Sequence, residues 1–300
     1  KQYSYMRILF LVLSLLTSSV FADTSDTERF KTIHDYALIA DAAYYGEDQA
    51  KKVLAAQGYT LTDHGELPGY AVSYYLATND AAKQQLLAVR GTSNVENALV
   101  DVAFNLLPNK HTGIKIHQGF ANSADYTWSK VEPKLNSGYV INTTGHSLGG
   151  AVALILAMYL DADGYDVGKV ITFGQPKVTN MAGGRQYAHL DITRVVTPKD
   201  MVPLMPPLDP MDMMSMDIYW HLGTELVLQE GNSYSELEGV DSMMRATDFL
   251  NEMITEKNLQ HHFMAEYINL IAPKLVNAKR IQYQNDFSIY DWFSTGGSGK

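Results

Sequence analysis

The stretch YVINTTGHSLGGAVALILAMYL, residues 139–160, passes from a β-branched apolar run through a serine flanked by glycines into a long apolar pattern. Residues 139–144 are typical of a strand, and residues 151–160 are typical of a buried helix. A tight turn centred on Ser147 joins the two segments. A strand, a turn and a helix in this order predict one crossover unit of an α/β sheet.

Further strand and helix patterns alternate on both sides of this unit. Strands are predicted at 70–78, 84–91, 169–173 and 192–197, and helices at 48–57, 123–135 and 262–275, after a first helix that follows the capping box at 25–28. The strands are nearly all apolar, so both faces of the sheet should be buried. We therefore expect an α/β fold, with a mostly parallel central sheet and helices on both faces.

The composition predicts a globular protein without cysteine-ligated metals and without a nucleic-acid partner. Of its 300 residues, 46% are hydrophobic and 19% are charged, which is typical of a folded chain. The absence of cysteine excludes disulfides and thiolate catalysis. A net charge of -10 without a basic patch argues against a nucleic-acid partner. The sequence does not indicate an oligomeric state.

The first residues have the pattern of a signal peptide. A positive start at Met6-Arg7, an apolar run from Ile8 to Leu16 and small residues ending at Ala22 predict a signal over 6–22. The alternative is a membrane anchor, but the apolar run is shorter than the roughly 20 residues that a span requires. We therefore expect secretion, extracellular or periplasmic, and no permanent anchor. Residues 23–295 are expected to form a single domain, and 1–5 and 296–300 resemble linker residues.

Ser147 is a candidate nucleophile. It stands in G-x-S-x-G, which chance produces in about one chain of this length in ten. The strand before it and the helix after it are the setting of a nucleophile elbow, in which a strained turn raises the serine at the end of the sheet. The N–H of Leu148, at the helix start, would stabilise an oxyanion there. The alternative is a structural turn with an incidental serine.

A serine nucleophile needs a base and an orienting carboxylate. Asp200 follows the strand at 192–197, at the carboxyl end where open α/β sheets place functional groups. The histidines that follow the serine are His189, His221, His261 and His262. The order Ser, Asp, His is that of α/β-hydrolases, but the pattern alone leaves the choice among the four histidines open.

Five motifs together resemble the class 3 lipases, relatives of the filamentous-fungal triacylglycerol lipases, and the chain is similar to a secreted member of bacterial type. They are VRGT (89–92), HQGF (117–120), GHSLGG (145–150), RVVTPKDMVPLMPP (194–207) and YWHLGTEL (219–226). The resemblance implies that Ser147 is the nucleophile and Asp200 the acid. HFMAEY (262–267) matches the late helix with a tyrosine after the histidine, which implies that His262 is the base rather than His261, and that His221 is structural.

The resemblance also implies an α/β-hydrolase fold and the remaining parts of the site. Thr92 follows the strand at 84–91 and would offer its N–H beside that of Leu148 to complete an oxyanion hole; the alternative is an ordinary turn threonine. A lid is expected in the segment 93–108, as a short amphipathic helix with Asp101 holding the loop beneath it; the alternative is a core helix. The apolar face of that helix would carry Val95, Leu99, Val102 and Leu106.

These expectations define a serine ester hydrolase. Hydrolysis would proceed through an acyl-enzyme, with no cofactor and no metal, on fatty-acyl esters at an oil–water interface. Triacylglycerol lipase or carboxylesterase activity is the leading expectation. Phospholipase A1 or feruloyl-type esterase activity on the same triad is the alternative within this class, and a catalytically inactive exported binding protein is the alternative outside it.

Overall fold

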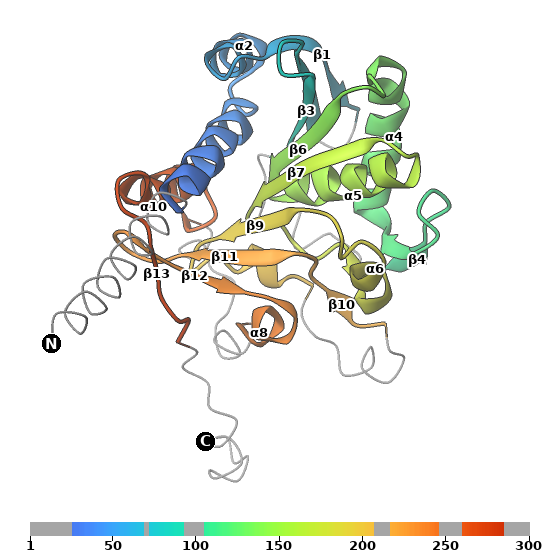
Figure 1. Ribbon diagram of the computed structural model, residues 1–300. Helices are drawn as coiled ribbons and strands as arrows, with labels where there is room; N and C mark the ends of the chain where they lie inside the picture. The colour runs from blue at the N-terminus through green and yellow to red at the C-terminus, as the bar shows by residue number, and fades with distance from the viewer. Residues whose placement is uncertain (1–25, 69–71, 93–104, 207–216, 246–259, 285–300) are drawn as a thin grey trace, which may run out of the picture.

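The computed structural model describes residues 26–68, 72–92, 105–206, 217–245 and 260–284. In these residues a mixed sheet of nine strands crosses the molecule in the order β1-β2-β3-β6-β7-β9-β11-β12-β13 (Figure 1). Neighbours from β3 to β11 run parallel, while β1, β2 and β12 add antiparallel pairs. The strands are β1 (Thr60–Leu67), β2 (Val72–Asn79), β3 (Gln84–Arg90), β6 (Val140–His146), β7 (Asp166–Phe173), β9 (Ile192–Val196), β11 (Thr224–Leu228), β12 (Ser233–Leu237) and β13 (Lys279–Arg280).

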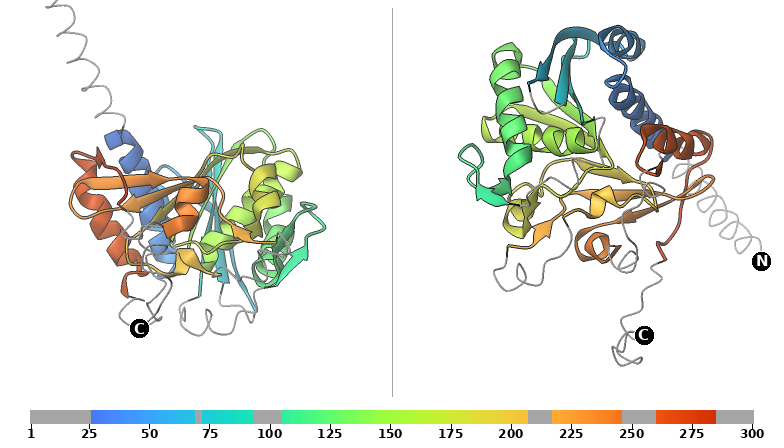
Figure 2. Two further views of the ribbon diagram at one scale, coloured as in Figure 1. Left: turned by 90° about the horizontal axis from the view of Figure 1, so that it is seen from below. Right: turned by 180° about the vertical axis from the view of Figure 1, so that it is seen from behind.

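Helices cover both faces of this sheet (Figures 1 and 2). Leu87 and Val89 of β3 pack on the side of α4 (Gln118–Val131) and α5 (Leu148–Ala162). Leu86 and Ala88 alternate with them and pack on the opposite side, with the helix over residues 26–42 and α2 (Glu47–Ala56). Helix α10 (Met264–Ile271) lies beside residues 26–42 on that same side. Because successive side chains of a strand point to opposite faces of the sheet, the core consists of two layers, one on each face.

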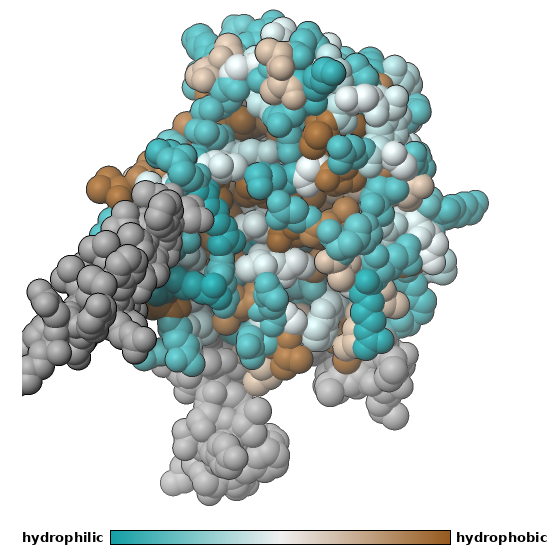
Figure 3. Space-filling model, viewed as in Figure 1, coloured by the Kyte–Doolittle hydropathy of each residue, from teal (hydrophilic) through white to brown (hydrophobic). Residues whose placement is uncertain are grey.

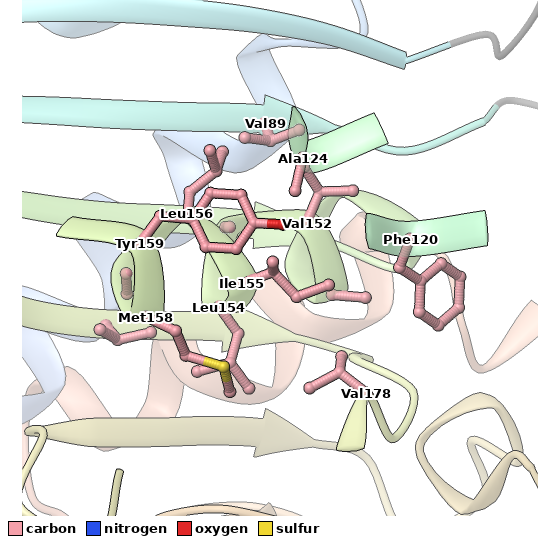
Figure 4. Close-up of a cluster of buried hydrophobic side chains, with 14 of the residues drawn as sticks. Val89, Phe120, Ala124, Val152, Leu154, Ile155, Leu156, Met158, Tyr159 and Val178 are labelled. Carbon is pink, nitrogen blue, oxygen red and sulfur yellow. The ribbon is translucent and has the colours of Figure 1, made fainter. Parts of the chain in front are cut away.

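Helix α5 forms the centre of the larger core layer (Figure 4). All its residues from Gly149 to Leu160 are buried, between the sheet and α4. The one polar tip among its large side chains is satisfied, since the Tyr159 hydroxyl donates to Asp125 Oδ1 at 2.6 Å and accepts from Asn109 Nδ2 at 2.8 Å. Because α5 is apolar on all sides, it is packed on all sides. This packing fixes the position of the helix and of the turn that precedes it.

Smaller elements complete the described chain. A second sheet has the strand order β10-β8-β5-β4, and short helices α6 and α8 and 3-10 turns η1, η2 and η4 join the larger elements. Their bounds are β4 (Leu106–Pro108), β5 (Lys115–His117), β8 (Thr179–Asn180), β10 (Tyr219–Trp220), α6 (Met181–Gln186), α8 (Gly239–Met244), η1 (Glu132–Lys134), η2 (Val202–Leu204) and η4 (Ala272–Leu275). Polar side chains cover most of the face drawn in Figure 3, where apolar residues form small scattered groups.

The predicted α/β fold class is confirmed: a mostly parallel central sheet carries helices on both faces. The predicted signal at 6–22, Asp101 and three of the lid residues, Val95, Leu99 and Val102, lie outside the described residues. Leu106, the fourth, contradicts a helix that continues to this point, because it lies in β4 and pairs with His117. Within the described ranges, no helix combines the length and apolar character needed to cross a membrane.

Candidate active site

Ser147 occupies a sharp turn between β6 and α5. Its backbone angles are φ 59° and ψ -132°, a left-handed region that costs a residue with a side chain about 1–3 kcal/mol. The neighbouring glycines make the turn possible. A Cβ on Gly145 would lie 2.5 Å from Gly149 O, and a Cβ on Gly149 would lie 2.2 Å from Val89 O. The Ser147 N–H donates to Phe173 O, at the end of β7, at 2.9 Å. The serine therefore lies at the carboxyl end of the sheet, in a strained turn that the two glycines allow.

The predicted oxyanion donors lie on adjacent segments. Leu148 opens α5, so its N–H belongs to the unpaired first turn of that helix. The end of β3 passes directly against it, because a Cβ on Gly91 would lie 3.2 Å from Leu148 N. Thr92 is the next residue, and it is buried. The close approach of two backbones therefore brings the segments of Leu148 and Thr92 together.

Asp200 lies beyond the end of β9 and is fully buried. Its Oδ1 accepts from Val202 N at 2.9 Å, and its Oδ2 accepts from His262 Nδ1 at 2.8 Å and from the hydroxyl of Tyr267. Gly174 leaves room for this pair, since a Cβ there would lie 2.8 Å from His262 Cε1. The carboxylate is thus held by three donors, which stabilise it in a buried position.

His262 and His261 have opposite surroundings although they are neighbours in the chain. The His262 ring is buried and, because a carboxylate can only accept, its Nδ1 carries the proton donated to Asp200. Its buried Nε2 has no hydrogen-bond partner among the described residues. His261 is partly exposed and lies 3.7 Å from Glu266. His221, expected to be structural, is buried with Nε2 2.6 Å from Pro203 O.

The structure adds two residues that the sequence did not indicate, Tyr44 and His146. The Nε2 of His146 lies 2.7 Å from the backbone oxygen of His262, and Nδ1 lies 2.8 Å from the hydroxyl of Tyr44. A carbonyl only accepts, so His146 donates from Nε2 and accepts at Nδ1. Burial, together with the nearby His262, holds the pKa of His146 well below its usual range. The neutral His146 ring lies 4.5 Å from the ring of His262, and Ser147 is the next residue. No periodic pattern or motif signals Tyr44.

A buried charged cluster supports the loop that carries Asp200. Lys177 donates from Nζ to Leu204 O at 2.5 Å and to Pro206 O at 2.7 Å, and burial lowers its pKa to about 7. Glu225 pairs with Arg194 at 3.4 Å and with Arg245. The Lys177 bonds tie the loop after β9 to the segment after β7, and the Glu225 pairs join β11 to β9 and to the residue after α8. Within the described residues, no group of three or more acidic or histidine side chains is placed to hold a metal ion.

Comparisons with known proteins find similarity to lipases. Residues 86–209 match the family described as Lipase (class 3). The chain is 30% identical over 152 residues to secreted mono- and diacylglycerol lipase 1 of Fusarium solani, covering 46% of this chain and 44% of that protein. It is 26% identical to a lipase of Rhizomucor miehei, covering 67% of this chain and 56% of that protein. The chain thus spans about half the length of these curated relatives.

Solved structures of lipases are also similar to this chain. Lipase II from Rhizopus niveus has a TM-score of 0.58 at 26% identity, over 68% of this chain and 82% of that one. A structure described as that of fungal lipases has a TM-score of 0.65 at 21% identity, over 84% of this chain and 99% of that one, and shows the fold alone. These relatives give no support to the bacterial-type expectation. The strand, turn and helix around Ser147 thus lie within residues 86–209, the part of the chain that is similar to the class 3 lipases.

Proposed function

We propose that the protein is a secreted serine ester hydrolase that cleaves fatty-acyl esters, with Ser147 as nucleophile, His262 as base and Asp200 as the orienting acid. One observation carries this proposal. A buried histidine gives Nδ1 to a buried carboxylate and keeps Nε2 without a partner in the described residues, at the sheet end where a serine has positive φ. Such a histidine has one fixed tautomer and one free lone pair, as a general base requires.

The chemistry follows from these contacts. Nε2 of His262 takes the proton from Ser147 Oγ as that oxygen attacks the ester carbonyl, and the negative carbonyl oxygen is held by the N–H groups of Leu148 and Thr92. The imidazolium then gives the proton to the leaving alcohol, which leaves an acyl-serine. Water, deprotonated by His262, then attacks the acyl-serine, and the imidazolium returns this proton to Ser147 Oγ as the fatty acid leaves. Asp200 holds the ring in position and stabilises its charge during both steps.

The names of the relatives support acylglycerols as substrates. The Fusarium solani relative is called a secreted mono- and diacylglycerol lipase, and so is a relative from Penicillium cyclopium, at 26% identity over 73% of this chain and 77% of that protein. Both names also support secretion. Fatty-acyl esters of glycerol at an oil–water interface are the proposed substrates of this chain.

The two adjacent histidines provide the sharpest test. We expect His262→Ala to lower kcat for p-nitrophenyl butyrate by about 10⁴-fold or more, as loss of one triad member does elsewhere. His261→Ala is the matched control, because it removes the same side chain one residue away and is expected to keep most of the activity. Ser147→Ala and its control Ser123→Ala, a buried serine of α4, test the nucleophile in the same way. Full activity in Ser147→Ala, or equal losses for both histidine variants, would refute the proposal.

A further inference from the structure

A cavity lies directly beside the proposed oxyanion hole. Its volume is about 440 Å³, within the range of small-molecule sites, and it opens between the end of the helix over 26–42 and the start of α10. Thr92 and His146 form its wall on the side of the site. Two large aromatic side chains on its lining, Tyr45 and Phe263, are 69% and 55% exposed. The lining is otherwise mainly apolar, so the cavity favours an organic ligand over water.

One charged group breaks this apolar lining. Asp41 is half-buried, and no described residue makes a hydrogen bond or ion pair with its carboxylate. It is the only acidic residue among the described residues of the lining. Burial raises the pKa of the Asp41 carboxyl above its ordinary value. A partly buried carboxyl that has no partner among the described residues keeps its capacity to bond with a ligand.

The position of Thr92 restricts what enters this cavity. On the proposed function, on which this inference rests, the ester carbonyl lies at Thr92, so either the acyl chain or the alcohol must extend past it. A hydrocarbon chain placed against Asp41 would remove the carboxyl from water without replacing its hydrogen bonds, which is unfavourable. A hydroxyl replaces them in either state of the carboxyl, because it donates to a carboxylate and accepts from a carboxylic acid.

We infer that this cavity binds the alcohol part of the ester, and that Asp41 hydrogen-bonds to a free hydroxyl of that alcohol. Tyr45 and Phe263 then flank its carbon skeleton. The preferred substrates are partial acylglycerols, which keep at least one free hydroxyl, over esters of alcohols that have none.

Two soluble esters test this selectivity. Glycerol 1-monobutyrate and n-propyl butyrate share the acyl group and a three-carbon alcohol, and they differ in two hydroxyls. The measured quantity is the ratio of their kcat/KM values, divided by the ratio of their rates of hydrolysis by hydroxide. We expect the wild type to favour the monobutyrate and Asp41→Ala to lower the ratio by about tenfold to a hundredfold, the worth of a hydrogen bond to a charged group. Asp41→Asn keeps an acceptor oxygen and should lose less.

Asp48→Ala is the matched control, since it removes an exposed carboxylate seven residues away and the same charge. It should leave the ratio unchanged, and thermal melting of each variant reports its folding. A ratio that is the same in Asp41→Ala as in the wild type overturns the inference while leaving the proposed ester hydrolysis intact. A larger loss for butyrylcholine than for the monobutyrate assigns Asp41 to a cationic alcohol and also overturns it. If the wild type hydrolyses neither ester, the proposed function falls and this inference with it.

Discussion

Gly149→Ala should destabilise the protein even though alanine is the better helix former. In the interior of a helix this replacement gains about 1 kcal/mol from propensity, and Gly149, the second residue of α5, gains no more than that. Here, however, the new Cβ would lie 2.2 Å from Val89 O and 2.5 Å from Gly91 N. These are backbone atoms at the end of β3, which is paired with β2 and β6, so they cannot move aside as a flexible side chain would. Overpacking of this kind costs about 3 kcal/mol, which leaves a net loss of about 2 kcal/mol.

Gly150→Ala is the control for this prediction. It makes the same replacement one residue later, where the nearest atoms to the new Cβ are Gly145 O at 3.1 Å and Gln175 Cβ at 3.2 Å. Small shifts relieve these contacts, so we expect a change within about 1 kcal/mol of zero. The assay is urea denaturation followed by tryptophan fluorescence, with the free energy of unfolding compared between the two variants. Equal free energies of unfolding would show that the approach of β3 to α5 is not what requires glycine at 149.

Two further predictions concern buried charges and protons. The Nδ1 of His117 accepts a hydrogen bond from Phe120 N, and burial lowers the pKa of His117 to about 4. In the unfolded chain this histidine has its ordinary pKa of about 6.5. Between these two pH values the unfolded chain therefore takes up a proton that the folded state does not. The free energy of unfolding should therefore fall by about 2–3 kcal/mol from this residue alone as the pH drops from about 6.5 to 4. Urea denaturation of His117→Asn should show a smaller fall over the same pH range. An identical pH dependence in this variant and the wild type would exclude His117 as the cause. Lys274 donates from Nζ to the backbone oxygens of Gln229, Gly231 and Leu270 at 2.7–2.9 Å. Because Lys274→Met leaves these three carbonyls without their donor, it should lower the free energy of unfolding by about 2–4 kcal/mol. The control Lys31→Met changes an exposed lysine and should cause no measurable change, so similar free energies of unfolding for both variants would contradict the prediction.

The strands predicted from the sequence are β2, β3, β6, β7 and β9, which follow one another in the order of the sheet. Strands β3, β6, β7 and β9 are paired on both edges and buried on both faces, so their apolar runs stand out from the surrounding chain. Strand β1 was not predicted, because it lies at the edge and its burial alternates along TLTDHGEL. With only one edge paired, it has no need of a continuous apolar run.

Strand β11 was missed for a different reason. Its sequence, TELVL, has Glu225 at the second position, and a charged residue normally indicates an exposed segment. The structure buries Glu225 at 1% exposure between Arg194 and Arg245, which come from β9 and from the residue after α8. These partners lie 31 residues before it and 20 residues after it. No local pattern reveals a buried ion pair whose members are so far apart, so β11 could not be predicted from its own residues.

The adjacent histidines show the same limit within the site. Both precede α10, and helical periodicity places neither of them on a particular face. Long-range hydrogen bonds distinguish them: Thr197 Oγ1 donates to His261 O at 3.1 Å, and His146 Nε2 donates to His262 O at 2.7 Å. With the backbone held at both residues, only the His262 ring reaches Asp200. The donor to His262 is the second residue of G-x-S-x-G, a position that the motif leaves open. In this chain the turn that presents Ser147 therefore also contributes the hydrogen bond that orients the proposed base.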